Sequence, residues 1–161
     1  MSEFNFFNTG YEAILAGLTG TFVAQFIKVF TYLFTHKKIN FKIFTTTGGM
    51  PSSHTAGVIA LTTSIGLIDG FDSLVFAVSL GFSLIVMQDA SGVRRAAGKT
   101  AATLNRLVDE FVQKNQEVKP YAVLKELLGH TPLEVFCGMI LGIIIAFAMH
   151  NSSILFSCCS F

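Results

Sequence analysis

Four mostly apolar segments alternate with polar stretches along the chain. They cover residues 11–35, 55–69, 71–89 and 131–149. A helix needs about 20 mostly apolar residues to cross the hydrocarbon core of a bilayer, and these segments approach or exceed that length. The pattern therefore predicts an all-α, polytopic membrane helix bundle with about four transmembrane helices.

The stretch between the third and fourth apolar segments has a different pattern. Residues 91–128 hold most of the charged residues, and apolar residues recur there at steps of three and four, at Leu104, Leu107, Val108, Phe111 and Val112. This spacing is typical of an amphipathic helix outside the bilayer, and Pro120 is expected to interrupt it. We expect a helical insertion at 91–128 within a single membrane-embedded domain, 1–161.

The composition supports a membrane protein. Hydrophobic residues make up 52% of the chain and charged residues 13%, whereas average soluble domains carry about 25% charged residues. The net charge is +1, and Lys and Arg do not follow one face, which argues against a nucleic-acid partner. The three cysteines lack the even number and spacing of a disulfide framework or zinc site.

The flanking charges predict the orientation. Lys37 and Lys38 follow the first span and Arg94 and Arg95 follow the third, whereas acidic residues flank the opposite ends. Because cytoplasmic loops carry the excess of Lys and Arg, these ends are expected to be cytoplasmic. We therefore predict an integral, multi-pass membrane protein with both termini non-cytoplasmic and the insertion in the cytosol.

The unusual polar residues of the membrane part gather at this predicted cytoplasmic end. Lys28 lies inside the first span, about two turns or roughly 10 Å from its end. The sequence GGMPSSHT, residues 48–55, leads into the second span, and GHTPLE, residues 129–134, leads into the fourth. These residues are therefore expected to meet at one depth on one face.

Each of these features has a functional and a structural interpretation. Lys28 is expected to face a polar cavity, or to reach toward the headgroups along its stem. The stretch 48–55 has two interpretations, with Pro51 expected in the first helical turn in either case. Its glycines and serines form a phosphate site at a helix N-terminus, or they form a plain turn in which a serine caps the helix. Of Arg94 and Arg95, at most one is needed as an interfacial anchor, and the other is available to bind an anion.

The start of the fourth span reads as a capping box, with Thr131 as N-cap, Pro132 at the first helical position and Glu134 three residues after the cap. That interpretation leaves His130 unexplained. Two histidines, a carboxylate and cations on one face suit phosphoryl transfer, in which one imidazole attacks phosphorus and the other protonates the leaving oxygen. This scheme needs no metal, and no carboxylate cluster suited to Mg²⁺ is present in this part of the sequence.

The motifs resemble a known family. Lys28, PSSH at 51–54, Arg94 and HTPLEV at 130–135 resemble the three-part signature of the type 2 phosphatidic acid phosphatase (PAP2) superfamily, which includes vanadium haloperoxidases. AQFIK, GGMPSSHTAG, DASGVRRAAGK and LLGHTPLEVFCG are similar to its divergent branch of small membrane proteins. The resemblance covers nearly the whole chain.

The resemblance implies a PAP2-like helical core and a mechanism without metal or cofactor. It implies that His130 is the nucleophile that forms a phosphohistidine, that His54 is the general acid and that Glu134 orients His130. It also implies four phosphate-binding residues: Lys28, Ser52, Ser53 and Arg94. Arg94 is preferred to Arg95 because its position better matches the arginine of the family pattern.

The chain departs from the family pattern at several positions. The family places an Arg-Pro pair seven residues after its lysine, where this chain has Thr35 and His36, and Lys42 is a candidate substitute. Ser53 stands where the family has glycine and Glu134 where it has aspartate.

The preferred interpretation is a membrane phosphatase that hydrolyses a lipid phosphate or pyrophosphate at the cytoplasmic interface. A site at headgroup depth favours an amphiphilic substrate. Two alternatives stay open: a non-catalytic protein that binds a lipid headgroup, and a channel or carrier subunit. A homo-oligomer also stays open, although Gly138 and Gly142, at GxxxG spacing, are more typical of packing within the chain.

Overall fold

The computed structural model describes residues 8–37, 49–114 and 129–159, and the regular elements in these ranges are all helical. In chain order they are α1 (Gly10–His36), α2 (Ser53–Asp69), α3 (Leu74–Gln88), the π-helical turn η2 (Asp89–Val93), α4 (Arg94–Lys114) and α5 (Pro132–Cys159). The predicted all-α membrane bundle is confirmed.

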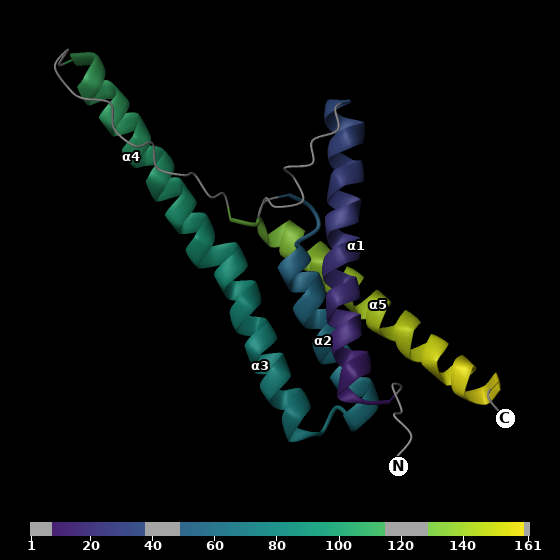
Figure 1. Cartoon of the computed structure of the whole chain (residues 1–161). Helices are drawn as coiled ribbons and strands as arrows, with labels where there is room; N and C mark the ends of the chain where they lie inside the picture. The colour runs from purple at the N-terminus through teal and green to yellow at the C-terminus, as the bar shows by residue number, and fades with distance from the viewer. Residues whose placement is uncertain (1–7, 38–48, 115–128, 160–161) are drawn as a thin grey trace.

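Helix α2 is the central element of the bundle. It packs against α1, α3 and α5, and Figure 1 shows α1 and α2 side by side with α5 crossing behind them. Helix α3 runs back toward the start of α2 and continues through η2 into α4, so that the three form one long rod (Figure 1). The start of α1 and the end of α5 lie at the end of the bundle opposite the start of α2.

Helices cover all four predicted spans, and three of them are long and apolar enough to cross a membrane. These are Gly10–Phe34, Leu74–Val112 and Pro132–Ser152. Helix α2 has 17 residues, which is about 25 Å at 1.5 Å per residue and less than the ~30 Å thickness of the hydrocarbon core. It is therefore a short helix enclosed by its neighbours.

The third span does not end in a loop before the predicted insertion. The Asp89 amide donates to the carbonyls of Ile85 and Val86, so the main-chain bonding of α3 runs on through η2 into α4. The exposed apolar side chains Leu104 and Phe111 lie on α4, in keeping with the amphipathic pattern. The rest of the insertion, including Pro120, lies outside the described residues.

Small residues set the close approach of the helices. A Cβ atom at Gly20 of α1 would lie 2.8 Å from the carbonyl oxygen of Ala56 on α2. On α5, a Cβ atom at Gly138 would lie 2.5 Å from Ser52 O, and one at Gly142 would lie 2.6 Å from Ala56 O. The GxxxG pair of α5 therefore packs within the chain against α2, as small residues do between membrane helices.

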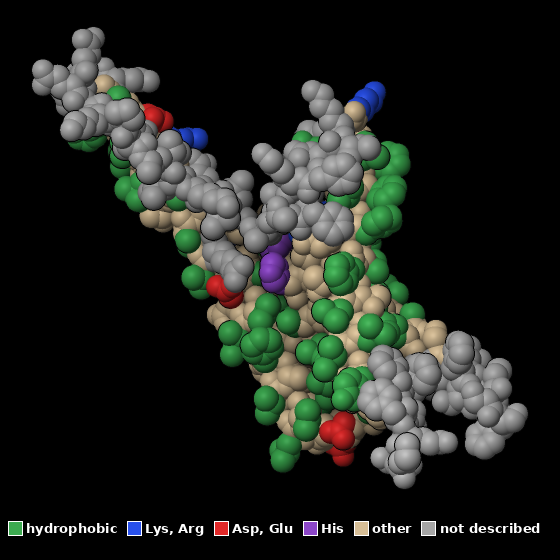
Figure 2. Space-filling model, in the orientation of Figure 1, with side chains coloured by type: hydrophobic (Ala, Val, Ile, Leu, Met, Phe, Trp, Pro, Cys, Tyr) green, Lys and Arg blue, Asp and Glu red, His purple; other side chains and the backbone are tan. Residues whose placement is uncertain are grey.

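Polar side chains also join the helices. Thr62 Oγ1 on α2 lies 2.8 Å from Ser83 Oγ on α3. In the first turn of α1, Glu12 Oε1 lies 3.2 Å from His150 Nδ1 on α5. Figure 2 shows hydrophobic side chains along the visible face, with the visible Lys and Arg side chains toward the end where α2 and α5 begin. That end carries the candidate site.

Candidate functional site

Lys28 turns inward from α1. Its side chain is only 3% exposed, and its Nζ lies 3.5 Å from Ser53 Oγ at the start of α2. Lys28 therefore faces the bundle interior and not the lipid headgroups. In an apolar environment such a cation needs polar partners, and the start of α2 supplies one of them.

The two serines at the start of α2 make different contacts. Ser52 is the N-cap: its Oγ accepts hydrogen bonds from Thr55 N at 3.4 Å and from Thr55 Oγ1 at 3.0 Å. Ser53 is the first residue of the helix and contacts Lys28. Pro51 therefore lies before the cap, and its expected place in the first helical turn is wrong. Both serines are buried.

Gly49 brings the chain into α2 above Lys28. Its φ is +97°, and a Cβ atom there would lie 3.9 Å from Lys28 Cδ. A positive φ is a conformation that glycine adopts at low cost. The backbone conformation therefore explains why a glycine occupies position 49, before the PSSH motif.

The start of α5 holds the second half of the site. His130 is 3% exposed, and its Nδ1 lies 2.8 Å from Glu134 Oε2. The same oxygen accepts the Thr131 amide at 3.3 Å, while the Glu134 amide donates to Thr131 Oγ1 at 3.3 Å. The predicted capping box is confirmed, and it places a carboxylate against the histidine.

Main-chain hydrogen bonds hold the two helix starts together. Ser52 N donates to Glu134 O at 3.0 Å, and His130 N donates to Ala90 O in η2 at 3.0 Å. Lys28 reaches the start of α2 through the contact of 3.5 Å between its Nζ and Ser53 Oγ. Two helix N-termini, with the positive ends of their dipoles, and one buried cation therefore converge at this point.

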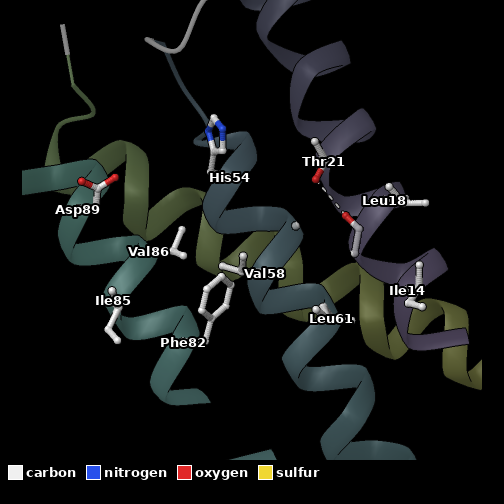
Figure 3. A pocket seen from close by; sticks show the side chains of 12 residues that line it. Ile14, Leu18, Thr21, His54, Val58, Leu61, Phe82, Ile85, Val86 and Asp89 are labelled. Carbon is white, nitrogen blue, oxygen red and sulfur yellow. Dashed lines mark hydrogen bonds between the residues drawn. The ribbon is translucent and has the colours of Figure 1, made fainter. Parts of the chain in front are cut away.

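The surroundings of His54 differ from those of His130. His54 is exposed in the first turn of α2 and lines a cavity of about 610 Å³ between α1, α2 and α3. Asp89, the first residue of η2, lies at the same end of this cavity (Figure 3). The structure thus places one histidine in the protein interior, beside Glu134, and the other at the mouth of a cavity.

The arginine of the predicted site is placed only by its backbone. Arg94 is the first residue of α4, directly after η2. The η2 turn contains Ala90, whose carbonyl accepts the His130 amide. The side chain of Arg94 lies outside the described residues, as does the whole of Lys42. Arg95 is partly buried.

Some contacts of the site were not predicted from the sequence. The hydrogen bonds of Ser52 N and His130 N are made by the main chain, which carries no residue-specific signal. Asp89 lies in a π-helical turn, and such turns are frequent at functional sites, but an acidic residue at the end of a span is ordinary. Among the described residues, no group of three His, Cys, Asp or Glu side chains is placed to hold a metal ion.

These features define an integral membrane protein whose helix ends gather a lysine, two serines and a histidine–carboxylate pair. The chain belongs to the Divergent PAP2 family, whose model matches residues 10–145. It is 43% identical over 145 residues to the uncharacterized membrane protein YuiD of Bacillus subtilis (strain 168), a match that covers 84% of this chain and 92% of that protein. No solved structure matches at a significant level.

Proposed function

We propose that this protein is a membrane phosphatase that hydrolyses a lipid phosphate or pyrophosphate through a phosphohistidine intermediate at the cytoplasmic interface. The observation that carries the proposal is the contact of 2.8 Å between His130 Nδ1 and Glu134 Oε2. It lies in the same helix-end cluster as the buried Lys28–Ser53 contact of 3.5 Å. A histidine oriented by a carboxylate is the arrangement of an activated nucleophile or base.

In the first half-reaction His130 attacks phosphorus. With Nδ1 against Glu134, the other ring nitrogen, Nε2, forms the N–P bond, and the carboxylate stabilises the imidazolium that results. The bond from phosphorus to the leaving oxygen breaks, and that oxygen takes a proton from His54. The leaving oxygen is the lipid's own oxygen in a monophosphate and the bridging oxygen in a pyrophosphate. The phosphoryl oxygens are bound by Lys28 and the α2 serines together with Arg94.

In the second half-reaction water releases the phosphate. His54, now neutral, accepts a proton from the water that attacks the phosphohistidine, and the N–P bond breaks. Inorganic phosphate leaves and His130 returns to its initial state. Fixed donors and cations at the phosphoryl oxygens stabilise the charge of both transition states.

The lipid nature of the substrate follows from the position of the site. Lys28 and Ser53 are buried at the end of a bundle whose outer surface is apolar. An amphiphile in the leaflet presents its phosphate at this depth, whereas a soluble ester must leave water to reach it.

The test is phosphate release from purified protein in detergent micelles that contain polyprenyl phosphate or phosphatidic acid. His130→Ala is expected to abolish turnover and the acid-labile label that ³²P-labelled substrate leaves on the protein. His150→Ala is a matched control, since His150 lies on the same helix near its other end. Unchanged phosphate release in His130→Ala would overturn the proposal.

The alternatives predict different results in the same preparation. A non-catalytic headgroup-binding protein retains phosphate or vanadate binding that depends on Lys28 but releases no phosphate. A channel or carrier subunit moves the anion across proteoliposomes without hydrolysis. Either result would replace the phosphatase assignment.

A further inference from the structure

The cavity between α1, α2 and α3 has a composition that the catalytic scheme does not explain. Its volume of about 610 Å³ lies within the range of about 300–1,000 Å³ typical of ligand pockets. Three helices form its wall (Figure 3). The lining residues are Ile14, Gly17, Leu18, Thr21, His54, Gly57, Val58, Leu61, Phe82, Ile85, Val86 and Asp89.

The polarity of the cavity is confined to one end. His54 on α2 and Asp89 at the end of α3 lie there, and the walls below them carry Val58 and Val86 (Figure 3). The hydroxyl of Thr21 donates to Gly17 O in its own helix at 3.0 Å, so this donor is already engaged. More than one helical turn from His54 and Asp89, the walls of the cavity are therefore hydrocarbon.

The polar end of the cavity adjoins the candidate phosphate site. His54 directly follows Ser53, whose Oγ lies 3.5 Å from Lys28 Nζ. On α1 the cavity-lining residue Thr21 lies seven residues before Lys28, which is two helical turns on the same face and about 10 Å along the axis. A molecule with its phosphate at Lys28 and Ser53 thus has an apolar cavity about two helical turns from the phosphate.

We propose that this cavity holds the hydrocarbon of the substrate, and that the substrate is a phosphate or pyrophosphate esterified directly to a long alkyl or isoprenoid chain. This inference rests on the proposed phosphatase function and narrows its substrate class. It selects such single-chain esters over glycerophospholipids such as phosphatidic acid.

The lining of the cavity is the reason for this choice. A diacylglycerol phosphate carries two ester carbonyls within a few bonds of its phosphate, and a carbonyl taken from water into an apolar site without a donor is penalised. One turn from His54 and Asp89 the lining residues are Gly57, Val58, Ile85 and Val86, none of which has a polar side chain. An alkyl or isoprenoid phosphate has only hydrocarbon at this depth.

The first experiment compares two substrates with the purified full-length protein in identical micelles. Hexadecyl phosphate is expected to be hydrolysed with a kcat/KM at least tenfold higher than that of dipalmitoyl phosphatidic acid. Val86→Trp places a large side chain in the cavity. It is expected to raise the KM for hexadecyl phosphate at least tenfold more than it raises the KM for phenyl phosphate, which has no long chain. Val78→Trp is the matched control, because Val78 lies on α3, is 74% exposed and does not line the cavity. Equal kcat/KM values for the two lipids would overturn the inference.

A binding measurement on the wild-type protein separates this inference from the proposed function. A hexadecyl phosphate with a diazirine near its phosphate end is photolysed with the protein, and the labelled residues are mapped. Labelling of Val58, Ile85 or Val86, displaced by excess hexadecyl phosphate and not by phosphatidic acid, supports the cavity as the chain site even if no phosphate ester is hydrolysed. Labelling confined to other helix faces overturns it, whatever the outcome of the phosphatase assay.

Discussion

His130 and Glu134 stand four residues apart at the start of α5, and Nδ1 of the first lies 2.8 Å from Oε2 of the second. The carboxylate oxygen that meets the imidazole also accepts the Thr131 amide at 3.3 Å. One atom therefore completes the helix cap and orients the proposed nucleophile. Because the two tasks use different partners, variants can separate them.

Thr131→Ala removes the hydroxyl that caps the Glu134 amide but leaves the contact between Glu134 and His130 in place. We expect a loss of stability of about 1 kcal/mol, as for other N-cap deletions, with kcat nearly unchanged. Thermal unfolding and phosphate release from the same preparation measure the two effects.

Glu134→Gln is the complementary change. Its amide oxygen still accepts the Thr131 amide, but it carries no charge to stabilise the imidazolium of His130. We expect kcat to fall by about 10²-fold or more, as when the aspartate of a catalytic triad is neutralised, with a small change in the unfolding temperature. Equal effects of Glu134→Gln and Thr131→Ala on kcat would show that Glu134 serves only the helix cap.

Lys28→Met tests the anion site without requiring turnover. A bound anion stabilises the folded state by linkage, by about 2.7 kcal/mol at a concentration 100 times its Kd. We expect vanadate or phosphate to raise the unfolding temperature of the wild-type protein and not that of Lys28→Met. Lys37→Met is the control, because Lys37 is an exposed residue at the C-cap of the same helix and its loss should leave the protection intact.

The local features of this site follow from the sequence, whereas their assembly does not. Thr131, Pro132 and Glu134 lie within four residues, so the capping box is predictable from spacing alone. The apolar segments also predict their helices, because length and hydropathy decide membrane spans. The contact between Ser52 N and Glu134 O joins residues more than 80 positions apart through main-chain atoms, and no side-chain pattern encodes it.

One prediction about the start of α2 failed for an identifiable reason, and one stays a prediction. Proline is favoured at the first helical position, but Ser52 takes the N-cap by accepting the Thr55 amide, which moves Pro51 out of the helix. The grouping of His54 with His130 around one phosphate stays a prediction. Successive residues on a helix point about 100° apart. With Ser53 toward Lys28, His54 turns to the cavity between α1, α2 and α3.

Gly138→Ala should weaken both the fold and the site. The added methyl group would lie 2.5 Å from Ser52 O, which forces α5 away from the start of α2. We expect a destabilisation of about 1–3 kcal/mol from overpacking, together with loss of the vanadate-dependent stabilisation. Gly81→Ala is the control, because apart from the neighbouring residues and backbone of its own helix no atom lies within 4 Å of the Cβ position at Gly81. Full vanadate protection in Gly138→Ala would show that the contact between α2 and α5 does not shape the anion site.

The orientation of the bundle can be tested by labelling single cysteines from outside the cell. Lys37, at the end of α1, and Asp72, between α2 and α3, are both exposed and lie at opposite ends of the bundle. In a background with Cys137, Cys158 and Cys159 replaced by serine, Asp72→Cys should react with a membrane-impermeant maleimide in intact cells. Lys37→Cys should react only after permeabilisation, because the positive-inside rule assigns the lysine-rich end, and with it the candidate site, to the cytoplasm. The reverse labelling pattern would move the site to the outer face and exclude cytoplasmic lipid phosphates as its substrates.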